Sequence, residues 1–488
     1  MFLVIDNHPF HFEMENICRV FFPLERIEVV RGAECPGGGD AALTGLKKDA
    51  AGNAVVSASV SVDGRQADFQ QALAADAGEK ARELAMADCL FSAFVSLCAY
   101  VPPWGMLTGV RPSKLMRTLI EGMGEDGARQ YFEHKLHVSE EKTALAAGIA
   151  AVQRPIIACS GPRSFSLYIS IPFCPTRCSY CSFVSHSIAW AKKLIAPYVS
   201  LLCTELRDTA RIANELGLRL ESVYFGGGTP TVLDAQDIRQ LADTLDAVFD
   251  MSNVREYTVE AGRPDTVTKE KLVVLKKAGV TRLSINPQSF DDAVLEKIGR
   301  KHTSRQTLEA FLLAREQGFE NINMDFIAGL PGDSAAGFSA GIQKAVALGA
   351  ENVTVHTLAF KRSAGLVTEK MQQTAFQSTE ELLAISKDIL QGAGYQPYYM
   401  YRQSKSVGNL ENTGWAKPGF ECEYNIYMME EIHTVLAAGA GAVTKLKAPN
   451  SSLIERIFNF KYPYEYIDRF AEMQARKERI GKFYGEYQ

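Results

Sequence analysis

Three cysteines stand close together in the chain and carry its strongest chemical signal. Cys174, Cys178 and Cys181 form a C-x3-C-x2-C run directly after an apolar segment typical of a strand. Iron–sulfur clusters are held by cysteine thiolates, and three thiolates leave one iron of a [4Fe–4S] cluster free for an external ligand. A structural zinc ion would need a fourth ligand, for which His186 is the nearest candidate. A chance grouping of three buried thiols is the remaining alternative.

A run of glycines follows another apolar segment 45 residues after the last of these cysteines. Gly226, Gly227 and Gly228 precede Thr229 and Pro230. Glycine lets a ligand approach the main chain without a Cβ in the way, so bare amide and carbonyl groups can bind the ammonium and carboxylate of an amino acid. A tight exit from a strand also uses glycine, and the run alone does not separate the two interpretations.

Polar side chains end or follow several later apolar segments. They are Glu260, Gln288, Arg300 and Asp325. A carboxylate can accept hydrogen bonds from ribose hydroxyls or an ammonium group, and an arginine can hold a carboxylate through two parallel hydrogen bonds. Taken singly, each of these residues could instead be a structural cap or part of a salt bridge.

The elements that position these residues are expected between residues 161 and 360, where short β-branched runs alternate with helical stretches. Such repeated βα units predict an α/β fold with a parallel sheet, most simply a partial (β/α)6 barrel. In parallel β/α architectures the loops at the carboxyl ends of the strands build the active site, so the chemistry is expected along one rim. The six strands are expected at residues 167–171, 222–225, 257–259, 282–285, 322–327 and 352–355.

The flanking parts of the chain have other patterns. Residues 1–103 predict a small α+β domain, with a strand at 54–62 and a helix over 70–100, and residues 104–160 predict a mostly helical linker. Residues 361–488 form a C-terminal extension that begins beyond the barrel, contains four tyrosines within 395–402 and ends in an amphipathic helical tail.

Composition narrows the class of protein. The 488 residues are 47% apolar and 22% charged, which excludes a disordered or collagen-like chain. The net charge of −5 argues against nucleic acid as a partner. The apolar stretch 89–101 is shorter than the roughly 20 residues that span a bilayer, and no secretory signal is expected at the start. Ten cysteines, of which seven are scattered, are typical of a reducing compartment, so a cytoplasmic protein without membrane contact is expected.

The cysteine run, with the aromatic Tyr180 before its last cysteine and in a β/α-barrel context, resembles that of the radical S-adenosylmethionine (SAM) superfamily. Residues 168–173 resemble its branch of oxygen-independent coproporphyrinogen III oxidases, and residues 226–230 its SAM-binding GGGTP motif. The resemblance implies a [4Fe–4S] cluster on the three cysteines, whose open iron binds the amino and carboxylate groups of SAM. One electron from a low-potential cluster would then release a 5′-deoxyadenosyl radical.

The same resemblance implies SAM contacts at positions that match in order and spacing, and it implies two SAM molecules, one on the cluster and one beside it. The implied contacts are Tyr168, Gly227, Gly228, Thr229, Glu260, Gln288, Arg300, Asp325, Ala359 and Val443.

Further segments extend the resemblance over nearly the whole chain, to the HemZ type of coproporphyrinogen dehydrogenase, with a HemN-like domain at 361–488. They are residues 104–112, 260–265, 285–289, 354–358, 399–403 and 408–412. The resemblance implies oxidative decarboxylation of two propionates of coproporphyrinogen III, which yields protoporphyrinogen IX in haem biosynthesis. It also implies a tetrapyrrole substrate, an electron donor such as ferredoxin or flavodoxin, and a monomer.

Two positions keep alternatives open. Phe183 stands where the best-characterised dehydrogenases have a further cysteine, which the haem-chaperone branch also lacks. That branch tends to carry a His-Asn pair, whereas the comparable stretch at 423–427 has no histidine. The alternatives are a haem-binding chaperone on the same scaffold and a radical SAM enzyme with another substrate, such as RNA.

Propionates require cations, and histidines and tyrosines also lie near the expected rim. Each candidate cation could instead be a surface charge, and each histidine could be a buried, hydrogen-bonded side chain. The tyrosines at 395–401 could be core residues or could form a surface that faces the porphyrin. The cations are Arg111, Lys114, Arg263, Lys361, Arg362 and Arg402, and the histidines are His302, His356 and His433.

Overall fold

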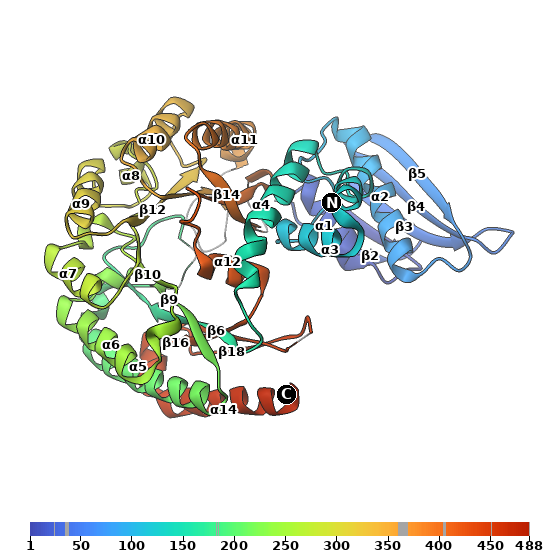
Figure 1. Ribbon diagram of the computed structural model, residues 1–488. Helices are drawn as coiled ribbons and strands as arrows, with labels where there is room; N and C mark the ends of the chain where they lie inside the picture. Colours follow the sequence, from blue (N-terminus) through green and yellow to red (C-terminus); the bar gives the residue numbers. More distant parts are fainter. Residues whose placement is uncertain are drawn as a thin grey trace. The chain divides into compact units, whose positions relative to one another are not determined.

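The computed structural model describes residues 1–23, 25–34, 39–181, 183, 185–359, 369–403, 407–449 and 451–487. The chain divides into two compact units (Figure 1). The amino-terminal unit comprises Met1–Ala147 and Arg402–Leu410, and the barrel unit comprises Gly148–Tyr401 and Glu411–Gln488. The fourfold division at residues 103, 160 and 360 stays a proposal drawn from the sequence pattern.

The amino-terminal unit is built on a five-stranded mixed sheet in the order β2-β1-β3-β4-β5. Alternate residues of β4 are buried, as the alternation of its sequence predicted, and α2 packs on this sheet. Its elements are β1 (Phe2–Asp6), α1 (His11–Phe21), β2 (Glu28–Arg31), β3 (Ala41–Lys48), β4 (Ala54–Val62), β5 (Arg65–Leu73), α2 (Glu79–Cys98) and α3 (Pro112–Gln130), followed by a π-helical turn (Tyr131–Lys135) and α4 (Glu140–Ala158), which continues into the barrel unit.

The helix expected over 70–100 begins later than predicted. Residues 70–73 belong to β5, which pairs antiparallel with β4 across a tight turn at Asp63 and Gly64. Both turn residues have positive φ, at 50° and 74°, as a two-residue hairpin turn requires. The Asp-Gly pair was the sequence signal for this hairpin, and it takes precedence over the helical spacing that follows.

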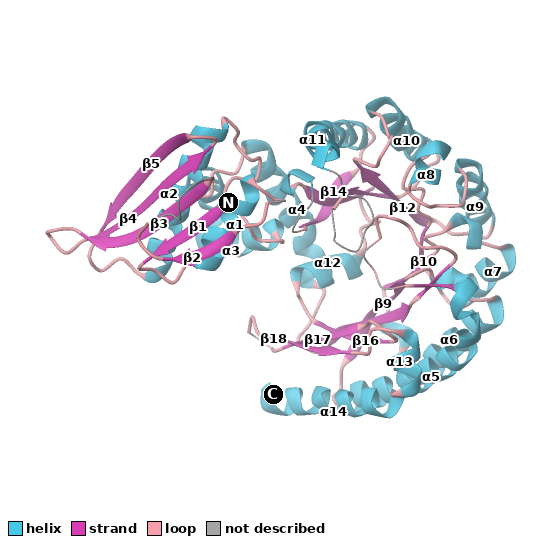
Figure 2. Ribbon diagram, turned by 180° about the vertical axis from the view of Figure 1, so that it is seen from behind, coloured by secondary structure: helices cyan, strands magenta, loops and turns pink. Residues whose placement is uncertain are grey.

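The barrel unit contains six parallel strands that are adjacent in sequence order, so the predicted partial (β/α)6 barrel is confirmed. Each strand coincides with an expected one, and Figure 2 shows the connecting helices on the outer side of the strands. The strands are β6 (Ser164–Ile171), β9 (Arg219–Gly227), β10 (Glu256–Glu260), β11 (Arg282–Ser284), β12 (Asn321–Ala328) and β13 (Asn352–Thr357). The helices are α5 (Ile188–Glu215), α6 (Ala235–Val248), α7 (Lys269–Lys277), α8 (Asp292–Lys297), α9 (Ser304–Glu316), α10 (Ala335–Ala347) and α11 (Glu369–Gly392).

Local sequence sets where several of these helices begin. The N-cap residue of each has a short polar side chain that accepts a hydrogen bond from a main-chain N–H in the first turn, which satisfies a donor that would otherwise have no partner. These caps are Asp234, Thr268, Asp291, Thr303 and Ser334, and Thr303 forms a capping box with Gln306. The helix starts, and with them the lengths of the rim loops, are therefore encoded locally.

The last part of the chain extends both edges of the same sheet. At one edge β15 pairs antiparallel with β13, and at the other β16 pairs parallel with β6. Figure 1 shows α12 on the inner side of the strands. The elements are β14 (Gln396–Arg402), β15 (Glu411–Ala416), α12 (Glu423–Glu430), β16 (Thr434–Ala438), β17 (Val443–Lys447), β18 (Ile454–Phe458), α13 (Pro463–Asp468) and α14 (Phe470–Tyr487). In the described part of the chain, no helix is both long and apolar enough to cross a lipid bilayer.

A buried ion pair attaches the C-terminal helices to the barrel. The Glu205 carboxylate on α5 lies 2.8 Å from Lys477 Nζ on α14, and both residues are almost fully buried. Glu205 also accepts hydrogen bonds from Gly439 N and Asn459 Nδ2 at 2.8 Å and from the Tyr466 hydroxyl at 2.6 Å. These contacts satisfy the carboxylate and fix the turn after β16.

Because a buried charge without its partner is costly, we expect Glu205→Gln to lower the free energy of unfolding of the barrel unit by roughly 3–5 kcal/mol. Urea denaturation followed by tryptophan fluorescence measures this change. The matched control is Glu309→Gln, which breaks the exposed Arg305–Glu309 pair on α9 and should change stability by less than about 1 kcal/mol. Equal losses in the two variants would contradict a special role for the buried pair.

Candidate functional site

Cys174 ends β7 (Phe173–Cys174), at the carboxyl end of β6, and Cys178 and Cys181 lie on the loop that follows. The two-residue strand β7 pairs with β8 (His186–Ser187), which leads directly into α5. The loop therefore occupies the rim position at which a barrel of this kind places its chemistry.

Residues from two other rim loops hold the cysteine loop in place. After β10, the Arg263 guanidinium donates to Thr176 Oγ1 at 2.9 Å. After α8, the carbonyl of Ile298 accepts from Ser179 N at 3.0 Å. Arg300 Nε donates to the Tyr180 hydroxyl at 3.1 Å. The conformation of the loop is thus specified by residues far away in sequence.

The charge distribution around the loop suits a thiolate-held cluster. Burial raises the pKa of Cys181, and repulsion from Cys178 and Cys174 adds to the effect. Burial disfavours the charged form of Arg300, but Tyr180 and Cys178 outweigh that effect and raise its pKa. A permanent cation beside a set of soft thiolate donors fits an iron–sulfur cluster, which the three cysteines would hold.

A single-ion site is a poorer fit. Within the described residues, no three His, Cys, Asp or Glu side chains are gathered closely enough to hold one metal ion. His186, the expected fourth zinc ligand, instead packs its ring on Trp190, with 5.2 Å between ring centroids. An iron–sulfur cluster does not require the three cysteines to gather around one ion, because each cysteine binds a separate iron.

The glycine run packs against the cysteine segment. A Cβ on Gly228 would lie 2.5 Å from the Phe173 carbonyl oxygen and 3.0 Å from Cys174 Sγ. The amide of Gly228 donates to the Ile171 carbonyl and that of Thr229 to the Phe173 carbonyl, both at 2.8 Å. These two amides, which the sequence suggested as ligand donors, are therefore used within the protein. The glycines are required here because two main-chain segments approach closely.

Because no side chain fits at this position, we expect Gly228→Ala to displace Cys174 and to weaken retention of cluster iron by about 10–100-fold. Iron and sulfide per chain after anaerobic reconstitution measure this effect. The control is Gly148→Ala on α4, where a Cβ has no neighbour within 4 Å among the described atoms. An iron content of Gly228→Ala equal to that of the control would contradict the steric argument.

Three tyrosines line the interior of the barrel beside Glu260. The three rings pack against one another, with centroid distances of 6.2 Å for Tyr168–Tyr224, 4.4 Å for Tyr224–Tyr424 and 6.1 Å for Tyr168–Tyr424. The Tyr224 hydroxyl donates to Glu260 Oε1 at 2.7 Å. Burial raises the pKa of Glu260 to about 7; the Tyr224 hydrogen bond opposes this shift, and repulsion from Asp325 adds to it. Glu260 can therefore gain or lose a proton near neutral pH.

Asp325 has the opposite electrostatic environment. Burial disfavours its charge, but the nearby His356 imidazole and a hydrogen bond from Asn323 outweigh burial and lower its pKa. Asn323 Nδ2 lies 2.7 Å from Asp325 Oδ1, and His356 Nε2 lies 3.7 Å from Oδ2. The site thus keeps one carboxylate charged next to one that titrates.

Gln288 is strained and incompletely hydrogen-bonded. Its φ of 66° lies in the left-handed region, which a residue other than glycine rarely adopts without support. Its main chain supplies that support by bonding to Asp325 O at 2.9 Å and to Ile327 N at 3.2 Å. Its buried Oε1 has no hydrogen-bond partner among the described residues. An unpaired buried acceptor beside Asp325 is suited to receive a donor from a ligand.

The titration of Glu260 gives a prediction for stability. Its folded pKa lies above the ordinary value of 4.5, so its contribution to the free energy of unfolding is complete below about pH 4.5 and is lost as the pH rises through about 7. The loss is on the order of 3 kcal/mol. Glu260→Gln should remove this decline, as measured by urea denaturation between about pH 5 and pH 8. Parallel pH profiles of the two proteins would show that Glu260 is not the titrating group.

Comparisons with known proteins agree with this geometry. A family model described as the radical SAM superfamily matches residues 168–340. The chain is 35% identical over 489 residues to the "Oxygen-independent coproporphyrinogen-III oxidase-like protein HemZ" of Bacillus subtilis (strain 168), a match that covers 97% of this chain and 96% of that protein. This chain belongs to the family of oxygen-independent coproporphyrinogen-III oxidase-like proteins of the HemZ type, within the radical SAM superfamily. The resemblance drawn from the cysteine and glycine motifs is thereby confirmed.

One further relative and one solved structure are also similar to this chain. The heme chaperone HemW of Bacillus subtilis is 33% identical, over 61% of this chain and 77% of that protein. The structure of the coproporphyrinogen III oxidase HemN from Escherichia coli, a radical SAM enzyme, matches with a TM-score of 0.50 and 22% identity, over 67% of this chain and 73% of that chain, and shows the shared fold. Membership of the superfamily implies a [4Fe–4S] cluster and SAM.

Not every residue expected in this radical SAM site is tied to it by a described contact. Ala359 lies two residues after β13, and Val443 opens β17, where it pairs with Phe458. Their assignment as SAM contacts stays a prediction, as do the other assignments. Lys361 and Arg362 lie outside the described residues.

Two expected cations are engaged within the protein. Arg263 pairs with Asp265 at 3.1 Å besides holding the cysteine loop. Arg402, in the amino-terminal unit, donates to the carbonyls of Leu107 and Asn409. Neither guanidinium is therefore a simple surface charge, and both have structural partners.

His433 and most tyrosines of the strand at 395–401 are core residues, whereas His302 is buried with neither ring nitrogen hydrogen-bonded among the described residues. His433 is buried and hydrogen-bonded to Ser160 and Ser166 at 2.7 Å, and burial lowers its pKa to about 4. Burial and the nearby cations Arg300 and Arg263 lower the pKa of His302 to about 3, so it is neutral at physiological pH. His356 contacts the site through Asp325.

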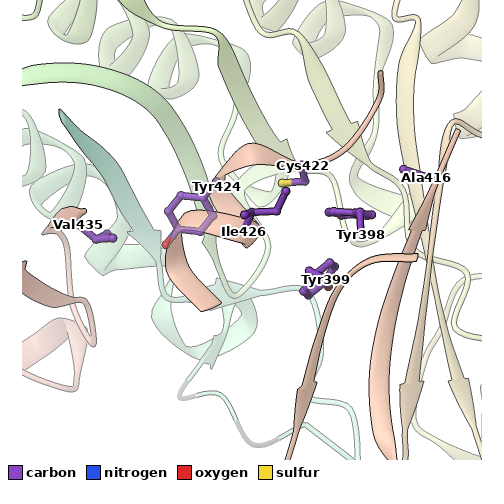
Figure 3. Packing of buried hydrophobic residues seen from close by; sticks show 7 residues of the cluster. All are labelled: Tyr398, Tyr399, Ala416, Cys422, Tyr424, Ile426 and Val435. Carbon is purple, nitrogen blue, oxygen red and sulfur yellow. The ribbon is translucent and has the colours of Figure 1, made fainter. Parts of the chain in front are cut away.

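Tyr424 is a site residue that the sequence did not reveal. Figure 3 shows it in the core cluster formed by Tyr398, Tyr399, Ala416, Cys422, Tyr424, Ile426 and Val435. Its segment is anchored by Glu256, which accepts from Cys422 Sγ at 3.2 Å and from Glu423 N at 2.9 Å. The Tyr424 hydroxyl is buried and has no hydrogen-bond partner in the part of the chain that the structure describes. Tyr224, by contrast, had a signal, since it shares a strand face with Gly226.

Proposed function

We propose that the protein is a radical SAM oxidoreductase that converts coproporphyrinogen III to protoporphyrinogen IX without oxygen. The observation that carries the proposal is the cysteine loop, fastened by Arg263 and Arg300 to the rim that also presents Glu260, Gln288 and Asp325. In support, the relative with full-length similarity is described as oxygen-independent coproporphyrinogen-III oxidase-like.

In this proposal Cys174, Cys178 and Cys181 hold the cluster, and two SAM molecules contact the predicted rim residues. When bound, the cluster would supply one electron to the sulfonium of SAM. Asp325 stays ionised to accept hydrogen bonds from a bound ligand, and Gln288 Oε1 accepts a further one. Glu260 accepts hydrogen bonds from ribose hydroxyls or an ammonium group better above about pH 7, where its carboxylate is ionised.

The overall reaction balances for each propionate. The side chain loses one hydrogen atom from the β-carbon, one molecule of CO2 and one electron, and a vinyl group remains. Two propionates require two hydrogen abstractions, which would fit two SAM molecules. The proposal includes a cytoplasmic monomer and a separate electron donor such as ferredoxin or flavodoxin.

A second candidate function is haem binding as a chaperone. The match to HemW and the exposed Phe183, which stands in place of a further cysteine, favour it. Against it, the comparable stretch at 423–427 has no histidine, and the Tyr424 ring within it is buried against Tyr168 and Tyr224. A radical SAM enzyme acting on RNA is a third candidate, which the net charge of −5 disfavours.

Anaerobically reconstituted protein with SAM, a reductant and coproporphyrinogen III should form 5′-deoxyadenosine together with vinyl products. Cys178→Ala should abolish both, because it removes a cluster ligand, whereas Cys159→Ala, which changes an exposed cysteine outside the loop, should leave both unchanged. Product analysis by liquid chromatography and mass spectrometry measures the two outcomes.

The outcomes separate the candidates. Formation of 5′-deoxyadenosine without harderoporphyrinogen or protoporphyrinogen would exclude the substrate while the radical chemistry stands. Stoichiometric haem binding without vinyl products would favour the chaperone, and tight tRNA binding with a steep salt dependence would favour RNA. Retained SAM cleavage in Cys178→Ala would contradict the ligand assignment.

A further inference from the structure

An aromatic cluster with two exposed members lies beside the cysteine loop. The ring of His186 packs against Trp190, Tyr462 and Tyr464, with centroid distances of 5.2, 5.9 and 6.3 Å. Tyr462 and Tyr464 stack on each other at 5.4 Å. Trp190 is 65% exposed and Tyr464 39% exposed. These four residues, called the aromatic patch below, come from β8, α5 and the start of α13, all in the barrel unit.

The aromatic patch is directly connected to the segment that carries the first cysteine. In the β7–β8 pair, Phe173 is opposite His186 and Cys174 is opposite Ser187. The Ser187 hydroxyl also donates to the Pro175 carbonyl at 3.2 Å. Paired strands lie about 5 Å apart, so a protein seated on the patch would come close to the cysteine loop.

Two cations lie next to patch residues, and two more follow Trp190 on α5. Arg177, in the cysteine loop, is near enough to His186 to contribute to its lowered pKa, although burial is the main cause. Lys461 Nζ lies 5.8 Å from the Tyr462 ring centroid. Lys192 and Lys193 follow Trp190 on α5, and all four cations are exposed. Two acidic residues are also on α13: Glu465 beside Tyr464 and Asp468 one turn later.

Exposed tryptophan and tyrosine rings with basic side chains beside them are unusual on a chain whose net charge is −5. Aromatic residues supply most of the binding energy at protein interfaces, and charged residues at the rim steer the partner. A complementary partner therefore has an acidic surface with an apolar centre. Because the patch adjoins the cysteine segment, the partner's chemistry should concern the group that the cysteines hold.

We infer that the aromatic patch docks an acidic one-electron carrier protein that reduces the cluster. The inference rests on the proposed function only in requiring a cluster on the three cysteines. In the step, the carrier loses one electron and the cluster gains it, and no atom or proton is transferred.

The test uses oxidised flavodoxin, an acidic one-electron flavoprotein, titrated onto the anaerobically reconstituted full-length protein by calorimetry. The double variant Lys192→Glu/Lys193→Glu and the variant Trp190→Ala should each weaken binding by about tenfold or more, and the double variant should reduce its salt dependence. The control is Lys269→Glu/Lys277→Glu, which reverses two exposed lysines on α7 and has the same net charge. The control should bind flavodoxin like the unchanged protein.

A second measurement separates this inference from the proposed function. With reduced flavodoxin, the patch variants should form 5′-deoxyadenosine at about one tenth of the unchanged protein's rate or slower. With dithionite, which needs no docking surface, they should match the unchanged protein. If no 5′-deoxyadenosine forms with either reductant, the proposed function fails, and the binding titration still decides the docking surface.

Three results would overturn the docking surface: no binding of flavodoxin to the unchanged protein, equal losses of binding in the patch and control variants, or an effect of the patch variants on self-association or coproporphyrinogen binding alone. The last result would assign the aromatic patch to a second copy of the chain or to the tetrapyrrole.

Discussion

The main chain of the glycine run lies so close to the cysteine segment that not even a methyl group fits between Gly228 and Phe173. The contact is cross-linked by two main-chain hydrogen bonds and by the Thr229 hydroxyl, which lies 3.5 Å from Cys174 Sγ. It joins the ends of β6 and β9, and the loops after β10 and α8 then fasten the rest of the cysteine loop. Cys174 is therefore positioned by the strand ends of the barrel itself, and the loop that carries Cys178 and Cys181 is fastened to the neighbouring loops.

Within the barrel, two carboxylates a short distance apart are given different protonation behaviour by their neighbours. Asp325 has hydrogen-bond donors that stabilise its charge, whereas Glu260 is enclosed by aromatic rings and has the Tyr224 hydroxyl as donor. Repulsion between them disfavours simultaneous ionisation. The arrangement can thus present one fixed negative charge and one adjustable acceptor to a ligand that carries both hydroxyl and ammonium groups.

Sequence patterns were sufficient where the physical cause is local. The six strands of the barrel, the rim position of Glu260 and the grouping of the cysteines follow from alternation, spacing and the rule that loops at carboxyl ends meet. The helical spacing predicts too early a start for α2, because the hairpin at Asp63 and Gly64 places residues 65–73 in β5. Tyr424 could not be predicted, because its position depends on an anchor at Glu256, which lies far from it in the sequence. For the same reason, nothing in the local pattern showed that Arg263 is tied to the cysteine loop through Thr176.

The placement of the last strands has a consequence for biosynthesis. β16 completes the sheet next to β6, although more than half of the chain lies between them, and Lys477 on the final helix neutralises Glu205 on the first barrel helix. During translation, β6 therefore leaves the ribosome long before its neighbour exists, with one edge open and able to pair with foreign strands. Such non-local closure is slow. A nascent or truncated chain that lacks β16 therefore exposes this edge of β6 to aggregation.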